Sequence, residues 1–371
     1  MKRPTKKTGT LPDSLILDMI RSEAIVGASE THVNPASLDL AVSDEIYRVE
    51  RSFLPKNGET IRENLKVIGA QPHTPGLPME SGVTYLARAT TSLRLPESIY
   101  GYCNPKSSTG RTDVHVRVMA DGVARYDSIA PAGYHGEVWL LIKPQLIPII
   151  LPVGEPISQI RFFDGDTRLK ESELESAYRK DRLAFDLRGK AIPWNRISIS
   201  DRDGSLILTA DLESKVIGWE CPGTNKVIDF GKRDFYRPQD FFTPVRKDGT
   251  GFAILKGGNF YILSVREAVR IPPTYACEMI PMDERSGEFR SHYAGFLDPG
   301  WGWGRKGEGK GRPFTLEVRP FEDIVLRDGQ PIAKIRFERM IDTPLIHYDQ
   351  KSTSHYTSQR QARLSKHFRE R

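Results

Sequence analysis

The sequence predicts a mainly β protein built from two tandem β-barrel or jelly-roll domains with a few short helices. Three observations lead to this prediction: an internal repeat, strand-like segments that end at a proline, and frequent turn sequences. A chain of 371 residues is long enough for two domains. Its hydrophobic share of 38%, together with 31 glycines, is ordinary for a globular protein and excludes a mainly disordered chain.

The internal repeat is the strongest of the three observations. Three segments of the first half recur in the second half, in the same order and at nearly constant spacing. They are PASLDL (35–40) with LTADL (208–212), LRLP (93–96) with VRIP (269–272), and PISQIRF (156–162) with PIAKIRF (331–337). These pairs are 172, 176 and 175 residues apart. One such pair is compatible with chance, but three in order predict a duplicated domain of about 170 residues.

The individual elements follow from local patterns. Residues 83–95 and 260–271 are rich in β-branched and aromatic residues, and a proline closes each, so both predict strands. Residues 13–20 predict a helix with Leu15, Ile16, Met19 and Ile20 on one face, behind Asp13 as the cap. Residues 167–180 are charged and predict a second helix, in the connection between the domains.

These patterns divide the chain into four parts. The expected boundaries are a first domain over 1–165, a linker over 166–200, a second domain over 201–340 and a C-terminal lid over 341–371. Repeated Asp-Gly and Asn-Gly pairs mark tight turns within both domains, as small all-β domains require.

The net charge of +6 is concentrated at the two ends of the chain. Residues 1–7 carry four basic residues, and residues 360–371 carry five against one glutamate, so the rest of the chain sums to −2. Basic termini on a nearly neutral body give little reason to expect nucleic-acid binding. We expect no nucleic-acid partner.

The expected compartment is the cytoplasm. No apolar run approaches the roughly 20 residues that span a bilayer, and the basic N-terminus leads into no apolar signal core. Cys103, Cys221 and Cys277 are too far apart to form a Cys-x-x-Cys pair. We therefore expect a reduced protein without a membrane partner.

A cluster of polar residues at 106–111 has the composition of a phosphate site. Lys106, Ser107, Ser108 and Arg111 offer a point charge, hydroxyls and a planar fork of donors within one short stretch. Phosphate oxygens favour such donors. The alternative is a plain turn that faces solvent, and composition alone does not decide between them.

Two carboxylates of the second half are candidate site residues. Asp298 lies at an Asp-Pro-Gly turn, where it can bond a sugar hydroxyl or only its own backbone. Glu317 lies within an apolar strand segment. It is either on the outer face of that strand or a partly buried carboxylate with a raised pKa, which suits proton transfer.

The ordered set of these motifs resembles the dCTP deaminase family of the dUTPase-like superfamily, duplicated in tandem. The resemblance rests on VNPASLDL (33–40), KSSTGR (106–111), AGFLDPGW (294–301) with LE (316–317), and the tail from Tyr348 through HYTSQR (355–360) to LSKHF (364–368). It implies two dUTPase-like distorted β-barrels (β-clip folds) and spans nearly the whole chain.

The two halves depart from the family pattern in complementary ways. The second half has Asp283 and Glu284 where the phosphate motif has serines, and these acids oppose a triphosphate. The first half has APAGY (130–134) where the hairpin aspartate is expected and Leu141 where the glutamate is expected. We therefore expect one composite site, in which the first half holds the phosphates and the second half holds the sugar and base.

The resemblance implies hydrolytic deamination of dCTP to dUTP and ammonia, with Glu317 as the general base. In this interpretation Ser107 and Arg111 position the attacking water, and Arg111 keeps Glu317 ionised. The implied substrate-binding residues are Lys106, Ser108, Ala294, Asp298, Tyr348, His355 and Gln359. Mg²⁺ accompanies the triphosphate, whereas the Pro-Cys-x-x-Cys signature of zinc deaminases is absent from the sequence.

Two other functions stay open at this stage. One is a bifunctional dCTP deaminase and dUTPase that releases dUMP and pyrophosphate, and the other is a non-catalytic nucleotide sensor. The resemblance also implies dTTP as a feedback ligand. A homo-oligomer, preferably a trimer of two-domain chains, follows by analogy with the three-domain rings of relatives.

Overall fold

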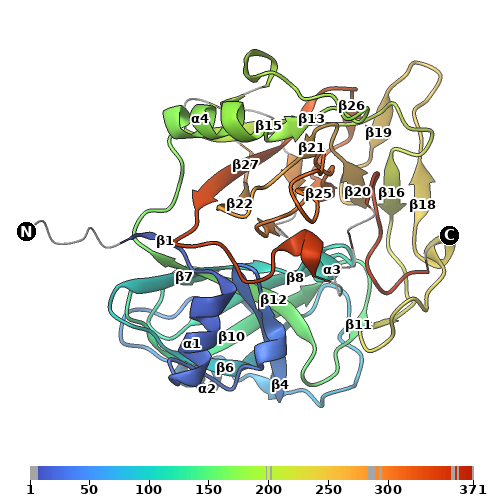
Figure 1. Ribbon diagram of the computed structural model, residues 1–371. Coiled ribbons are helices and arrows are strands. Elements are labelled where there is room, and N and C mark those ends of the chain that lie inside the picture. Colours follow the sequence, from blue (N-terminus) through green and yellow to red (C-terminus); the bar gives the residue numbers. More distant parts are fainter. Residues whose placement is uncertain are drawn as a thin grey trace, which may run out of the picture.

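The computed structural model describes residues 7–197, 199–200, 203–282, 289–291, 295–351, 356 and 359–369. It confirms the predicted fold class, with 38% of residues in strands and 13% in helices. Two β-rich halves pack against each other (Figure 1). The first half is blue to green in that view, and the second, which carries helix α4, is green to red.

One antiparallel sheet of eleven strands forms the first half and nearly closes into a barrel. Its main path runs in the order β8-β10-β6-β4-β12-β7-β9, and four short strands pair alongside. The strands are β1 (Gly9–Thr10), β2 (Ile25–Val26), β3 (Val33–Asn34), β4 (Ser37–Val49), β5 (Gln71–Pro72), β6 (Thr84–Arg94), β7 (Ile99–Pro105), β8 (Val114–Ala120), β9 (Ser128–Ile129), β10 (His135–Pro144) and β12 (Pro156–Asp164).

The second half divides its strands among smaller sheets. One five-stranded sheet comprises β14 (Ile199–Ser200), β15 (Ser205–Thr209), β27 (Pro331–Arg339), β22 (Tyr275–Ile280) and β24 (Phe296–Leu297). Another comprises β18 (Thr243–Val245), β16 (Gly218–Cys221), β20 (Phe260–Ser264), β25 (Thr315–Pro320) and β23 (Phe289–Ser291). Short pairs join β13 (Ala184–Phe185) to β21 (Ala268–Val269), β19 (Ala253–Leu255) to β26 (Ile324–Leu326), and β11 (Ile149–Ile150) to β17 (Ile228–Asp229).

Four α-helices lie within the described residues: α1 (Asp13–Arg21), α2 (Ile61–Val67), α3 (Ser107–Gly110) and α4 (Glu171–Asp181). The 3₁₀ helices are η1 (Glu30–His32), η2 (Trp194–Arg196), η3 (Pro238–Asp240) and η5 (Tyr348–Gln350). The predicted cap of α1 is wrong, because Pro12 holds the N-cap position. The carboxylate of Asp13 instead accepts the backbone N–H groups of Leu345 and Ile346, which ties the tail to this helix.

The strand registers show the duplication directly. β12 pairs with β4 through a bulge in which Ser158 faces Leu40, and β27 pairs with β15 through the same bulge, in which Ala333 faces Leu208. This register matches SLDL (37–40) with SLIL (205–208), which are 168 residues apart. The predicted match of residues 35–40 with 208–212 was therefore wrong by four residues, because the resemblance of Asp-Leu to Asp-Leu misaligned it.

A second register relates the two halves at the position of Glu317. Leu141 of β10 pairs with Leu86 of β6, and Glu317 of β25 pairs with Ile262 of β20. Glu317 follows Leu141 by 176 residues, and Ile262 follows Leu86 by the same number. Leu141 therefore holds the position in the first half that Glu317 holds in the second.

Part of the second half packs into the hydrophobic core of the first half, and the second half also has a core of its own. Phe230, Phe242 and Phe260 of the second half pack into the core of the first half, together with Leu364 and Phe368 of the tail. This packing fixes the tail and one face of the second half against the first-half barrel, beside helix α3.

Candidate active site

The predicted phosphate segment, residues 106–111, folds as helix α3 and its two flanking residues. Lys106 is the N-cap residue, and its carbonyl accepts two backbone N–H groups of the helix. This turn leaves Ser108 only 6% exposed and Arg111 3% exposed. The segment is therefore not the plain solvent-facing turn that composition alone allowed.

A cavity of about 330 Å³ opens beside α3. Lys106, Ser107 and Ser108 line it from the first half, Asp298 from the second half, and Tyr348 from the tail. The other lining residues are Thr31, Asn34, Asp39, Pro156, Gln159, Arg233, Lys351, Tyr356 and Lys366. Predicted residues from both halves thus line one cavity within a single chain.

The N-terminal motif holds Lys106 at the edge of this cavity. Lys106 donates from Nζ to Asp39 Oδ2, and the same carboxylate accepts from Asn34 Nδ2 at 2.8 Å. Lys351 of the tail donates to Asn34 Oδ1 at 2.7 Å. Asn34 and Asp39 therefore orient two lysines toward the cavity.

The hairpin that carries Asp298 turns tightly under the tail. Trp301 donates its backbone N–H to Asp298 O at 3.2 Å. Gly300 has a φ of +90°, and a Cβ there would lie 2.4 Å from Nδ1 of His347. Only glycine fits both this backbone conformation and this close approach. The turn leaves the Asp298 side chain at the cavity wall.

Asp298 lies beside a buried cation from the first half. Arg161 is 0% exposed, and its Nη2 lies 3.5 Å from Asp298 Oδ1. Arg161 also donates to Glu338 at 3.0 Å and to the carbonyl of Cys277 at 3.0 Å. Burial raises the pKa of Asp298, and the positive charges of Arg161 and Lys351 partly offset that rise.

Glu317 lies inside the protein on β25, only 1% exposed. The alternative of an outer-face glutamate is therefore wrong. Among the described residues, neither of its carboxylate oxygens has a hydrogen-bond partner. Its ion-pair partner is Arg111, whose Nε lies 3.4 Å from Glu317 Oε1. Burial raises the pKa of Glu317 to about 7, while Arg111 opposes that rise.

Arg111 connects Glu317 to the C-terminal tail. Its Nη2 donates to Gln359 Oε1 at 3.2 Å, and its Nη1 donates to the carbonyl of Arg363 at 3.1 Å. The Tyr356 ring packs against the guanidinium, 4.0 Å from ring centroid to Cζ. The tail of the same chain thus covers the pair that joins the two halves.

The predicted lid residues fall into two groups. Tyr348 lines the cavity and packs on Trp301 with 5.1 Å between ring centroids, and Gln359 contacts Arg111. Ala294 and His355 lie outside the described residues, as do Asp283 and Glu284.

Sequence reasoning missed several residues of the site: Arg161, Arg233, Lys351, Tyr356, Arg363 and Lys366. Tyr356 stands within the tail motif, so the motif carried a signal for it. Arg161 lies within the repeated segment 156–162. The spacing of the repeat does not indicate that its side chain is buried.

Comparison with known proteins agrees with this arrangement of two halves. Residues 7–166 match the family described as 2'-deoxycytidine 5'-triphosphate deaminase (DCD) N-terminal domain, and residues 170–368 match its C-terminal domain. The chain belongs to the dCTP deaminase family.

A solved structure shares the fold of this dCTP deaminase family member. The crystal structure of 2'-deoxycytidine 5'-triphosphate deaminase from Agrobacterium tumefaciens is 35% identical, with a TM-score of 0.82. The match covers 91% of this chain and 99% of that chain. No curated protein matches the chain.

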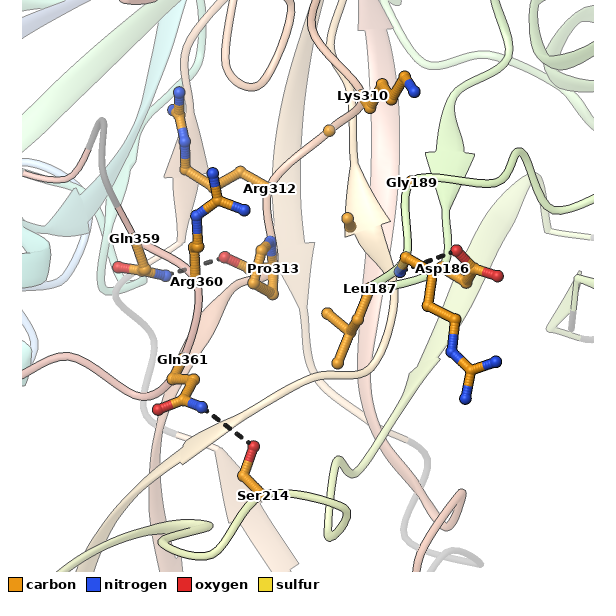
Figure 2. A pocket seen from close by; sticks show the side chains of 13 residues that line it. Asp186, Leu187, Gly189, Ser214, Lys310, Arg312, Pro313, Gln359, Arg360 and Gln361 are labelled. Carbon is orange, nitrogen blue, oxygen red and sulfur yellow. Dashed lines mark hydrogen bonds between the residues drawn. The ribbon is translucent and has the colours of Figure 1, made fainter.

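Gln359 also lines another cavity of this family member, of about 630 Å³, in which Gln359, Arg312 and Pro313 lie opposite Asp186, Leu187 and Gly189 (Figure 2). Gln359 donates from Nε2 to the carbonyl of Pro313 at 2.8 Å, and Gln361 donates to Ser214 at 3.2 Å. Gln359 is therefore bonded on one side to Pro313, just before β25, and on the other to Arg111. These two bonds fix the position of the tail at residue 359.

Within the part of the chain that the structure describes, no group of three or more His, Cys, Asp or Glu side chains is placed to hold a metal ion. Cys103, Cys221 and Cys277 are buried free thiols. Among the described residues, no helix has the length and apolarity to cross a membrane.

Proposed function

We propose that this chain catalyses the hydrolytic deamination of dCTP at C4 of the cytosine ring, releasing dUTP and ammonia. The observation that carries the proposal is the buried pair of Arg111 and Glu317, in which Arg111 packs against Tyr356, a residue of the cavity lining. A carboxylate whose pKa is about 7 can both accept and return a proton near neutral pH. Membership of the dCTP deaminase family supports the substrate class.

In the proposed mechanism Glu317 moves protons between water and the pyrimidine. The carboxylate accepts a proton from a water molecule while the water oxygen forms a bond with C4, and the proton passes to N3. The remaining hydroxyl proton then reaches the exocyclic nitrogen through Glu317, the C4–N bond breaks, and ammonia leaves. Ser107 and Arg111 orient the water, and Arg111 favours the ionised form of Glu317 before the reaction.

The rest of the cavity suits the other parts of the nucleotide. Lys106 and Ser108 would bind the phosphates, and Asp298 would accept a hydrogen bond from the 3′-hydroxyl of the sugar. Four cationic side chains line the cavity and would neutralise much of the negative charge of the phosphates. They are Lys106, Arg233, Lys351 and Lys366. Mg²⁺ would enter with dCTP as part of the substrate, held by phosphate oxygens and water.

Further parts of the proposal rest on the family resemblance. Ala294 would contact the base edge, and Tyr348, His355 and Gln359 would close over the nucleotide. The reaction would need no zinc, because the sequence lacks the zinc-deaminase signature. Feedback by dTTP and a trimer of two-domain chains stay predictions.

A product assay tests the proposed function. Purified protein is incubated with dCTP and Mg²⁺, and dCTP, dUTP, dUMP and ammonia are resolved over time. Equal amounts of dUTP and ammonia are expected. Accumulation of dUMP would indicate a second hydrolysis at the α-phosphate, and binding of dCTP without turnover would favour the nucleotide sensor.

The pH dependence of kcat/KM is expected to follow the ionisation of Glu317. Because the base must be ionised, kcat/KM should rise tenfold per pH unit below about pH 7 and reach a plateau above it. This rising part of the profile is its acidic limb. If the base were an ordinary exposed glutamate, the acidic limb would lie near the usual glutamate pKa of 4.5. The measurement is kcat/KM for dCTP from pH 5 to 9.

The matched control for this profile is Glu267→Gln. Glu267 is also a buried glutamate of the second half with a raised pKa, but its carboxylate accepts hydrogen bonds from Thr209, whereas Glu317 pairs with Arg111. The Glu267→Gln profile should keep the limb near pH 7. A wild-type limb near 4.5 would contradict the assignment of Glu317.

A further inference from the structure

A second ion pair joins the same two segments that carry Arg111 and Glu317. Asp113 stands two residues after Arg111, and Arg319 stands two residues after Glu317. Arg319 donates from Nη2 to Asp113 Oδ2 at 2.5 Å, and Asp113 is 0% exposed. Two charge pairs therefore run side by side across the boundary between the halves.

The two pairs have opposite polarity. Along the first segment the charges run positive at Arg111 and negative at Asp113, whereas along β25 they run negative at Glu317 and positive at Arg319. Glu317 and Arg319 are two residues apart in strand β25, so they point to the same face, about 6.6 Å from each other. Arg111 and Asp113 lie in the turn between α3 and β8, which places one of them against each of these two residues. A shift of two residues would place Arg111 against Arg319, so like charges would meet. The pattern therefore stabilises one alignment of the two segments.

Asp113 and Arg319 are also anchored to their own halves. Asp113 accepts the backbone N–H of Leu146 on Oδ2 at 3.1 Å, and its carbonyl accepts from Gln145 at 3.0 Å. Arg319 donates to the carbonyl of Gly258 at 2.5 Å. The second pair therefore links two fixed points, whereas Arg111 is held by the tail.

The duplicated half does not carry this pattern. The positions equivalent to Glu317 and Arg319 in the first half are Leu141 and Lys143, by the shared register of β10 and β25. A general stabilising device of the fold would be expected in both halves. The two ion pairs, Arg111–Glu317 and Asp113–Arg319, instead occur together at the one place where Arg111 contacts Glu317.

We propose that Asp113 and Arg319 form a positioning pair that fixes β25 against α3, so that Glu317 faces Arg111 in the one productive alignment. Neither residue is assigned a contact with the nucleotide, because Asp113 is bonded to Leu146 and Arg319 to the carbonyl of Gly258. The inference rests on the proposed function, because the alignment is assigned to the deamination step.

The test is the double variant Asp113→Asn/Arg319→Met. Removing both charges leaves no buried charge unpaired, and their direct effects on Glu317 largely cancel. With the alignment loosened, Arg111 stabilises ionised Glu317 less, so the acidic limb of kcat/KM should move above pH 7. We expect kcat to fall by about 10- to 100-fold. KM for dCTP should change by less than about twofold, because the cavity lining is intact.

The charged and titratable groups around Glu317 make this readout specific. Arg111 faces Glu317 from α3, and Tyr356 and Arg363 of the tail surround Arg111. None of these three is altered in the double variant. Arg319→Lys is a second variant that keeps the charge and the fold, and it should restore most of kcat and return the limb toward pH 7.

The matched control is Arg117→Met/Asp127→Asn, which removes another ion pair, partly buried and also at 2.5 Å, from within the first half. It should lower the melting temperature without moving the acidic limb or kcat. An Asp113→Asn/Arg319→Met variant with wild-type kcat and limb would overturn the inference. Failure of the proposed function has a different outcome, because wild-type protein itself would then release no ammonia.

Discussion

Replacing Glu317 by Gln is expected to abolish release of ammonia from dCTP while binding of dCTP persists. The amide keeps the size of the side chain but cannot accept a proton, and positioned general bases contribute about 10²- to 10⁴-fold to rates. Ammonia release under saturating dCTP is the readout, with dCTP binding measured by calorimetry. Turnover by Glu317→Gln within a few-fold of wild type would remove Glu317 from the mechanism.

The stability of the same variant gives an internal control for folding. The pKa of Glu317 is about 7 in the folded protein and about 4.5 in the unfolded chain, so the folded state binds more protons between these values. The wild-type stability contributed by this group therefore falls as pH rises from 4.5 to 7. Glu317→Gln should be more stable than wild type at pH 8 by about 2–3 kcal/mol, and the two should converge below pH 4.5.

Replacing Arg111 by Ala is expected to have the second-largest effect, although Arg111 belongs to the other half of the chain. Its guanidinium is the cation beside Glu317 and the donor to Gln359 and to the Arg363 carbonyl. Its loss leaves a buried carboxylate without a partner, which raises the pKa of Glu317 above 7. We expect kcat/KM at pH 7.5 to fall by at least about 10²-fold, with partial recovery toward pH 9.

Arg111→Lys separates charge from geometry in that experiment. Lysine keeps a positive charge but lacks the planar fork that reaches Glu317, Gln359 and the Arg363 carbonyl together. Its acidic limb should return toward pH 7 while kcat stays low. An Arg111→Ala variant with an unchanged pH profile would contradict the role of Arg111 in tuning Glu317.

The fold class was predictable because duplication leaves a trace in the sequence. The pairs at 93–96 and 156–162 carried the right spacing, since they lie in or beside strands whose registers recur. The match of 35–40 with 208–212 gave an alignment that is wrong by four residues, because a two-residue identity such as Asp-Leu often arises by chance. The strand predicted over 260–271 is in fact two strands, β20 and β21, interrupted where Glu267 turns to bond Thr209.

Helix α2 begins at a sequence pattern that is typical of helix starts. Thr60 and Glu63 form a capping box before the apolar residues of that helix. Such a Thr-x-x-Glu pattern indicates a helix start even when the helix is as short as α2.

The candidate site was predictable where local motifs carry it. Lys106, Ser107, Ser108 and Asp298 line one cavity, although their roles stay predictions. For Glu317 the sequence allowed either an outer-face or a buried position. The choice depends on the packing of the tail over Arg111 and Glu317, which local sequence does not show. The contributions of Arg161 and of the Asp113–Arg319 pair depend on contacts between residues more than 100 positions apart, which spacing alone does not encode.

The central claim is that one chain contains a complete site, with Arg111 from its first half and Glu317 from its second. The most direct measurement co-expresses differently tagged Arg111→Ala and Glu317→Ala chains, purifies any mixed assembly through both tags, and assays ammonia release from dCTP. Because Arg111 and Glu317 lie 3.4 Å apart within a single chain, each chain would hold one damaged site. We predict no recovery of activity, in mixed assemblies or in the separate chains. Recovery of a substantial fraction of wild-type activity in the mixed assembly would show that the site is completed by a second chain, and would contradict the account.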